Sequence, residues 1–183
     1  HPCSGNFPWA RGNALEEYTL DRMENELTEA SRRLRDLLGV QPTTFAYPCG
    51  QTFVGRGASL QSYVPLVAKH FVAGRGYLGE VANDPSFCDL ALLNASGFDG
   101  LDFPAIDRLV QEAAAEGRWL ILAGHEVKKE GQSQTVTTTA LEGLCQYCRD
   151  HKAELWVDTV ANIAGFILQR RQLKPVPATS TRS

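Results

Sequence analysis

Short apolar runs alternate with amphipathic segments along this chain, and this alternation constrains its fold more than any other feature. Between residues 14 and 38, apolar residues recur at steps of three to five, which predicts one long amphipathic helix. Asn13 followed by Glu16 resembles a capping box at the start of this helix, and Gly39 suits the left-handed position after its end. The apolar run Thr43 to Tyr47 is then typical of a buried strand that enters a loop.

The alternation continues through the rest of the chain. The further predicted helices are Tyr63 to Lys69, Pro104 to Glu116, Thr139 to Asp150 and one that opens at Asp158, and the further predicted strands are His70 to Ala73, Arg118 to Ala123 and Glu154 to Val157. This order favours a parallel sheet with crossover helices, either doubly wound or closed into a barrel. Residues 174–183 hold two prolines and a Ser/Thr-rich end, which predicts a disordered tail after one domain over residues 1–173.

Charge and hydropathy disfavour two classes of partner. The 183 residues include 18 Lys and Arg against 21 Asp and Glu, a net charge of -3, so no excess of positive charge is present to neutralise phosphates. Nucleic acid is therefore not an expected partner. No run reaches the roughly 18 apolar residues of a membrane span, so no membrane span is expected either. The first residues lack the pattern of a secretory signal, and the sequence assigns no compartment.

The cysteines do not indicate a disulfide scaffold. Five cysteines are scattered along the chain, and their odd number leaves at least one thiol unpaired, so we expect mostly reduced, buried thiols. Cys145, Cys148 and His151 have the spacing of zinc ligands, but no second CxxC or CxxH pair completes a set of four. Thiols on a helix are the favoured interpretation, and a structural zinc site is the alternative.

Three segments carry side chains that could take part in chemistry. The opening loop has His1 at its end and an aromatic pair, Phe7 and Trp9, for which packing within the loop is the alternative to a role in binding. The segment Tyr47 to Gly50 follows a predicted strand, where parallel α/β folds place their active sites, although a simple Pro-Gly turn is the alternative. His125 follows a third predicted strand, so it should lie at the same edge of the sheet. A histidine there can act as general acid or base, and the alternative is a hydrogen-bonded rim histidine without a catalytic role.

Taken together, these segments resemble the polysaccharide deacetylases of the NodB-homology family, carbohydrate esterase family four. His1 resembles the second histidine of the family's H-[ST]-x-x-H metal motif, Ala46 to Gly50 matches the position of R-x-P-Y-G, and Leu122 to His125 matches the closing L-x-H. A subgroup shares the wording HPCSGNF, FAYPCGQTFVGRG and AGRGY. The resemblance runs from His1 to Arg171 and implies a distorted parallel (β/α) barrel of reduced strand number, incomplete at its N-terminus.

The resemblance also implies an activity, namely metal-dependent hydrolysis of N- or O-acetyl groups on a polysaccharide or related carbohydrate. A divalent metal, most of all zinc, would be held by His1 together with an aspartate and a histidine that the family pattern places upstream. Another upstream aspartate would be the base, the Cys49 amide would help to stabilise the oxyanion, and His125 would protonate the leaving group. The expected contacts to the acetylated carbohydrate are Trp9, Tyr47, Pro48 and Gly50.

The chain departs from the family pattern at two positions. The arginine that pairs with the catalytic aspartate is Ala46 here, and the tyrosine whose amide holds the oxyanion is Cys49. Any residue except proline supplies an amide, but alanine cannot replace the charge of arginine. We expect Arg75 to restore that charge, because its predicted strand should lie next to the strand that ends at Tyr47. A surface arginine in a glycine-rich turn is the alternative.

Other functions are weaker interpretations of the sequence. The segment Gly74 to Gly79 fits G-x-G-x-x-G, but no amphipathic helix follows it, which disfavours a dinucleotide-binding domain. Ser96 lacks the G-x-S-x-G pattern of serine hydrolases. Since this chain carries one of three expected metal ligands and no catalytic base, we expect it to be inactive alone. A non-catalytic carbohydrate-binding or structural remnant of the same fold is the remaining alternative.

Overall fold

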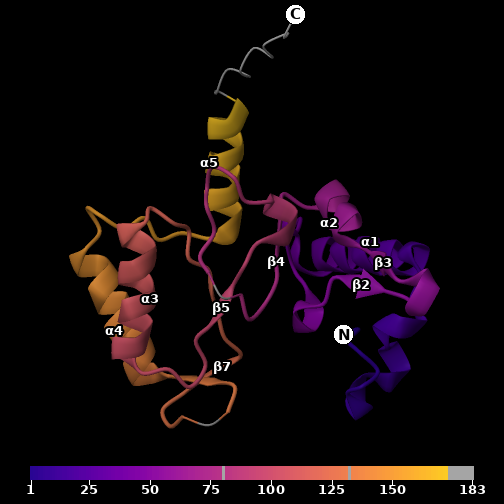
Figure 1. Ribbon diagram of the computed structural model, residues 1–183, viewed down its shortest axis with the longest axis horizontal. Coiled ribbons are helices and arrows are strands. Elements are labelled where there is room, and N and C mark those ends of the chain that lie inside the picture. The colour runs from indigo at the N-terminus through magenta and orange to yellow at the C-terminus, as the bar shows by residue number, and fades with distance from the viewer. Residues whose placement is uncertain (80, 132, 173–183) are drawn as a thin grey trace, which may run out of the picture.

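The computed structural model describes residues 1–79, 81–131 and 133–172, so the predicted tail at 174–183 lies outside the described residues. Its helices are α1 (Leu20–Leu38), α2 (Val64–His70), α3 (Phe103–Ala115), α4 (Thr138–Asp150) and α5 (Val160–Gln172) (Figure 1). Its strands are β1 (Thr44–Ala46), β2 (Phe53–Val54), β3 (Gln61–Ser62), β4 (Ala73–Arg75), β5 (Ser96–Gly97), β6 (Leu122–Ala123), β7 (Glu126–Lys128) and β8 (Thr135–Thr137).

The first helix starts later than predicted. Residues 8–13 and 15–17 form short 3₁₀ turns, and α1 begins at Leu20, where the Thr19 side chain accepts a hydrogen bond from the Arg22 amide at 3.2 Å. Glu16 does not cap the helix because its carboxylate accepts hydrogen bonds from Ser4 and Gly5 instead. The predicted end is confirmed: Gly39 follows the last turn with a φ of 67°.

Parallel strands follow one another in chain order. β1 pairs with β4, with Ala46 opposite Arg75, and β5 pairs with β6. The chain just before β5 pairs with β4 in parallel, because Leu93 donates a hydrogen bond to the Gly74 carbonyl and accepts one from the Gly76 amide, both at 2.8 Å. This order agrees with a (β/α) barrel. The described residues form two-stranded sheets and no closed barrel, so the reduced barrel stays a prediction. Of the other strands, β2 and β3 pair antiparallel and β7 and β8 pair parallel.

Three strand predictions differ from the structure. The strand predicted at His70 to Ala73 comes later, since His70 still ends α2. The strand predicted at Arg118 to Ala123 shortens to β6, because Trp119 instead exchanges backbone hydrogen bonds with Asn83. The prediction of a strand at Glu154 to Val157 is wrong: two amides there donate to the His151 carbonyl at the end of α4, and no neighbouring strand among the described residues pairs with the segment.

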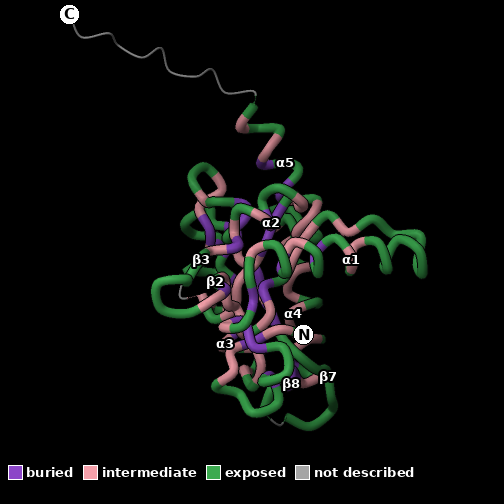
Figure 2. Tube along the Cα trace, turned by 90° about the vertical axis from the view of Figure 1, so that its right-hand side faces the viewer, coloured by how far each residue is buried: buried purple, intermediate pink, exposed green. Residues whose placement is uncertain are grey.

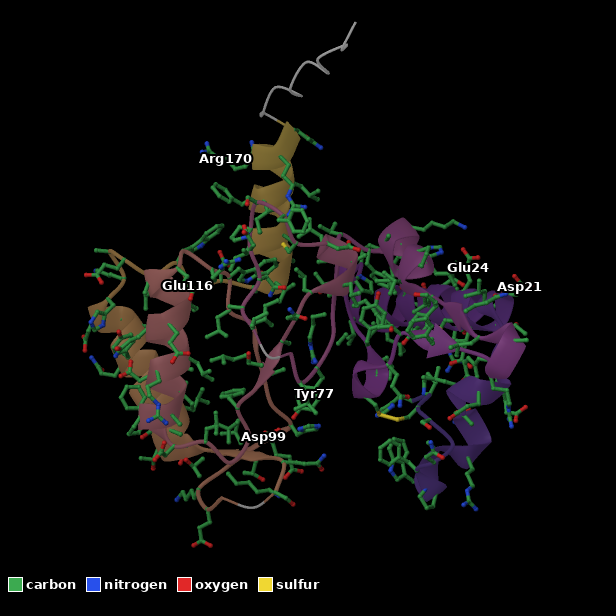
Figure 3. The ribbon with its side chains drawn as sticks, viewed as in Figure 1. Asp21, Glu24, Tyr77, Asp99, Glu116 and Arg170 are labelled. Carbon is green, nitrogen blue, oxygen red and sulfur yellow. A yellow bond between two sulfur atoms is a disulfide. The ribbon has the colours of Figure 1, made fainter. Side chains whose placement is uncertain are left out.

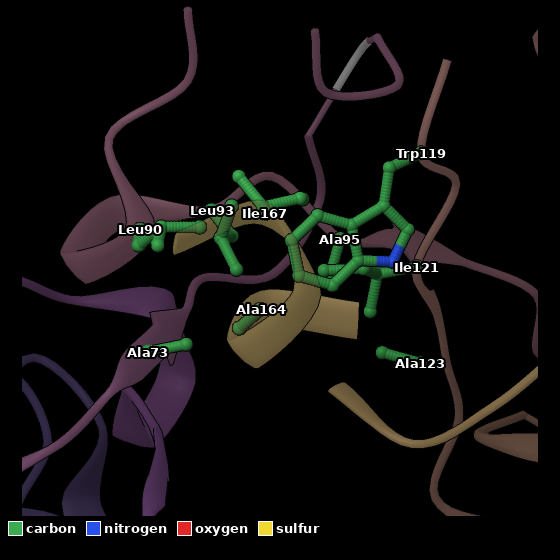
Figure 4. Close-up of a cluster of buried hydrophobic side chains, with 9 residues drawn as sticks. All are labelled: Ala73, Leu90, Leu93, Ala95, Trp119, Ile121, Ala123, Ala164 and Ile167. Atoms are coloured by element: carbon green, nitrogen blue, oxygen red, sulfur yellow. The ribbon is translucent and has the colours of Figure 1, made fainter. Parts of the chain in front are cut away.

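Two clusters of buried apolar side chains form the core. The first joins the strand segments to α5, and Figure 4 shows its members, which are Ala73, Leu90, Leu93, Ala95, Trp119, Ile121, Ala123, Ala164 and Ile167. The second packs α1 and α2 against β1 and β2, and consists of Leu15, Tyr18, Met23, Leu27, Tyr47, Val54, Tyr63 and Val67. Burial of these side chains is the main favourable term in folding.

The helices surround these clusters unevenly. Figure 1 shows α3 and α4 side by side, and Figure 2 shows that the second half of α1 is exposed to solvent. Leu37 and Leu38 at that end are 80% and 67% exposed.

Within the described ranges, no helix combines the length and apolar character needed to cross a membrane.

Candidate functional site

The candidate site lies where the parallel strands end. The turn Tyr47 to Gly50 follows β1, and Tyr77, Asp99 and His125 each stand two residues beyond the last residue of β4, β5 and β6, respectively. Because these strands pair in parallel, their C-terminal ends face the same edge. Figure 3 shows Tyr77 and Asp99 close together at this edge.

Asp99 holds the imidazole of His125 through two hydrogen bonds. Asp99 Oδ2 lies 2.6 Å from His125 Nδ1, and Asp99 Oδ1 accepts the His125 backbone amide at 3.0 Å. The Asp99 side chain is 11% exposed, whereas that of His125 is 44% exposed. An ionised carboxylate only accepts hydrogen bonds, so Nδ1 carries a proton and the other ring nitrogen, Nε2, is left to exchange one.

Tyr77 completes this group. Its hydroxyl donates to Asp99 Oδ2 at 3.2 Å, and its ring meets that of His125 edge to face, with the centroids 5.4 Å apart. Burial would raise the pKa of Asp99, but the hydrogen bonds from His125 and Tyr77 outweigh it, and the pKa lies below its usual value. Burial, followed by the hydrogen bond to Asp99, raises the pKa of Tyr77. Asp99 is therefore ionised and Tyr77 protonated at neutral pH.

The turn after β1 has an unusual backbone. Cys49 and Gly50 both have positive φ angles, 54° and 68°, and the Cys49 amide donates no hydrogen bond to another backbone group among the described residues. Tyr47 is 2% exposed, and its hydroxyl donates to the Ala91 carbonyl at 2.7 Å. Burial, with the nearby charge of Asp89, raises the pKa of this buried tyrosine. The Tyr47 ring belongs to the core and offers no face to a substrate, contrary to our expectation.

A disulfide joins this turn to the opening loop. Cys3 pairs with Cys49, with their Cα atoms 6.2 Å apart, so the expectation of mostly reduced thiols is wrong for this pair. The sequence contains no signal that selects these two cysteines, which are 46 positions apart. Cys88, Cys145 and Cys148 are free thiols, and the last two lie on α4.

The opening loop presents aromatic side chains beside the disulfide. His1 is exposed and its ring packs edge to face on Trp9, with the centroids 5.5 Å apart, while Phe7 stacks on Trp9 at 5.7 Å. Trp9 is 62% and Phe7 45% exposed. Hydrogen bonds from Ser4 and Gly5 to the Glu16 carboxylate hold this loop and lower the pKa of Glu16.

Arg75 lies across from Ala46, the position at which the resemblance implies an arginine. As the sequence predicts, the strand that carries Arg75 is the parallel neighbour of β1, and Arg75 pairs with Ala46. Its half-buried guanidinium donates to the Gly76 carbonyl at 3.1 Å, and no carboxylate among the described residues forms an ion pair with it. Burial lowers the pKa of Arg75, since it disfavours the charged form.

Contacts connect these groups into one site. A β-carbon added at Gly50 would lie 3.2 Å from the Tyr77 amide nitrogen, so the turn packs directly on the backbone of Tyr77. A series of contacts therefore runs from the turn at Cys49 through Tyr77 to the Asp99–His125 pair. Tyr77 and Asp99 were not among the site residues predicted from the sequence. A carboxylate soon after the apolar run at residues 90–93 was the available signal for Asp99.

The described residues do not by themselves complete the zinc site that the resemblance implies. They contain no group of three or more His, Cys, Asp or Glu side chains placed to hold a metal ion. His1 would supply one nitrogen, whereas catalytic zinc takes three protein ligands. At the C-terminal end of α4, the ring of the cap residue His151 stacks on Tyr147 with centroids 4.0 Å apart, and its Nδ1 contacts the Tyr147 carbonyl.

No family model, curated protein or solved structure matches this chain. The assignment of a function therefore depends on the residues of the site and on the motifs that they carry.

Proposed function

We propose that this chain forms the general-acid side of a hydrolase that removes N- or O-acetyl groups from a polysaccharide or related carbohydrate. One observation carries the proposal: the Asp99–His125 pair stands at the ends of parallel strands, in the same connected group as the turn with the Cys49 amide. The resemblance to the NodB-homology deacetylases supplies the reaction class, and the geometry is compatible with it.

In this proposal His125 delivers a proton to the leaving group. Water gives a proton to the aspartate base that the resemblance implies and adds to the acetyl carbon. The bond from that carbon to the sugar nitrogen or oxygen then breaks, and the proton on Nε2 of His125 passes to the departing amine or alkoxide. The products are acetate and a free amine or hydroxyl group. Asp99 stabilises the protonated ring before transfer, because its ionised carboxylate lies 2.6 Å from Nδ1.

The Cys49 amide would stabilise the oxyanion that forms on the acetyl group. A backbone amide that has no acceptor among the described residues is the kind of donor that suits a developing negative charge. Pro48 and Gly50 shape the turn around it, and the packing of Gly50 on Tyr77 places the turn beside the Asp99–His125 pair.

Three further residues have proposed roles. Arg75 would pair with the catalytic aspartate that the family pattern places upstream, which agrees with its lack of a carboxylate partner among the described residues. His1 would be one of three protein ligands of zinc. Trp9, with its exposed indole, would pack against a sugar ring, since aromatic faces favour the apolar faces of sugars.

The test is the rate of acetate release by the full-length protein from an N-acetylglucosamine oligomer and from an O-acetylated xylan. Replacing His125 by Ala should lower kcat by about 10²- to 10⁴-fold, because a general acid contributes that much. His151→Ala is the matched control, since this histidine follows α4 and packs against Tyr147, with no contact to the Asp99–His125 pair among the described residues. A His125→Ala protein within about twofold of the wild type would rule out the general-acid role.

A non-catalytic carbohydrate-binding protein of the same fold is the second candidate. The exposed stack of Phe7 and Trp9 favours it, as does the incomplete metal site of the described residues. Binding of the same oligomer, lost in Trp9→Ala and accompanied by no acetate release from either substrate, would support this candidate over the hydrolase.

A further inference from the structure

Tyr77 contacts every part of the candidate site that lies at the strand ends. Its hydroxyl donates to Asp99, its ring packs against His125, and its backbone lies against Gly50 of the turn. A β-carbon added at Gly97 would lie 3.3 Å from the Tyr77 hydroxyl, so glycine at that position leaves room for the phenol. None of the sequence motifs assigns Tyr77 a role.

The hydrogen bonds of Asp99 show what Tyr77 adds. Asp99 Oδ1 accepts the His125 amide, while Oδ2 accepts both His125 Nδ1 and the Tyr77 hydroxyl. With only the two bonds from His125, the carboxylate would be held by a single residue. The third bond comes from another strand end, so the carboxylate is held from two strand ends and not only by the residue whose ring it orients.

We propose that Tyr77 is a positioning residue, which fixes the Asp99 carboxylate with its hydroxyl and limits rotation of the His125 ring with its own ring. Through these contacts, Nε2 of His125 stays directed at one place. The effect on turnover rests on the proposed function, whereas the effect on the Asp99–His125 pair does not. The phenol touches no reacting atom in this proposal.

The hydroxyl and the ring of Tyr77 can be separated by substitution. Tyr77 also packs against the first core cluster, so its removal would disturb the core. Tyr77→Phe keeps the ring and removes only the hydrogen bond to Asp99. Tyr18→Phe is the matched control, because the Tyr18 hydroxyl donates to a different carboxylate, that of Glu26, at 2.8 Å.

The experiment combines nitrogen NMR of the histidine rings with kinetics in the full-length protein. In the wild type, the ¹⁵N shifts of His125 should show a proton held on Nδ1. Tyr77→Phe should give a mixture of the two tautomers and lower kcat by about tenfold with KM within about twofold, the loss expected for one hydrogen bond to a charged group. Tyr18→Phe should leave the His125 signals and kcat unchanged.

The outcomes separate this inference from the proposed function. Unchanged His125 signals in Tyr77→Phe would overturn the positioning role, even if kcat fell. Altered signals together with an unchanged kcat would overturn its importance for the reaction. Altered signals in a protein that releases no acetate from either substrate would uphold the positioning of His125 and reject the hydrolase.

Discussion

Asp99 is the residue on which the arrangement of the candidate site depends most. Its carboxylate is nearly buried and accepts three hydrogen bonds, two from His125 and one from Tyr77. Burial of a carboxylate without such donors would favour the neutral acid. The three donors reverse that preference, so the same group that orients His125 also remains charged and able to stabilise its protonated ring.

Replacing Asp99 by Asn should make the stability of the protein less sensitive to acid. The pKa of Asp99 in the folded protein lies below the ordinary value of 3.8, so its stabilising effect is fully present above that value and is lost as pH falls through the lowered pKa. The free energy of unfolding, measured with urea between about pH 2 and pH 5, should therefore fall less steeply in Asp99→Asn. Asp150→Asn, at the exposed end of α4, is the control, and equal slopes in Asp99→Asn and the wild type would contradict the argument.

At the scale of secondary structure, α3 and α4 pack closely because one helix has a glycine at the contact. A β-carbon at Gly143 of α4 would lie 2.7 Å from Phe103 Cγ, at the start of α3. A β-carbon added at Gly165 of α5 would instead point into open space, with no neighbouring side chain within 4 Å. The two helical glycines thus share their backbone conformation but differ in their neighbours.

This difference predicts opposite effects of one substitution. Gly165→Ala should raise the free energy of unfolding by about 1 kcal/mol, because alanine favours the helix over glycine. Gly143→Ala should lower it by about 1–3 kcal/mol, since the added methyl group overpacks the contact with Phe103. Thermal and urea unfolding of both variants test the prediction, and stabilisation by Gly143→Ala would show that the two helices separate easily.

Across the whole molecule, the disulfide connects the N-terminal loop to the ends of the strands. The loop carries His1 and Trp9, and the bond between Cys3 and Cys49 holds it against the turn after β1. A cross-link of this kind restricts the unfolded chain, and for a segment of this length the restriction corresponds to about 3–4 kcal/mol.

Removing the disulfide should therefore destabilise the protein. The double variant Cys3→Ser and Cys49→Ser should lose about 3 kcal/mol in the free energy of unfolding, and reductant should lower the Tm of the wild type but not of the double variant. Cys88→Ser is the control, because Cys88 is a free thiol. A wild-type Tm that does not respond to reductant after complete thiol release would contradict the prediction.

Features that depend on near neighbours could be predicted from the sequence. The end of α1 at Gly39, the helices near Pro104 to Glu116 and Thr139 to Asp150, and a histidine just past a strand all follow from periodicity, caps and turns within a few residues. The parallel pairing of β1 with β4 followed from chain order alone.

Only the tertiary structure decided the partners of these features. Asp99 meets His125 across 26 positions and Tyr77 across 22, and the disulfide spans 46. Which side chains meet over such separations depends on how the strands lie side by side, and no local pattern encodes it. For the same reason the sequence left Tyr47 as a candidate substrate contact, whereas packing against Tyr63 and a hydrogen bond to the Ala91 carbonyl bury its ring in the core.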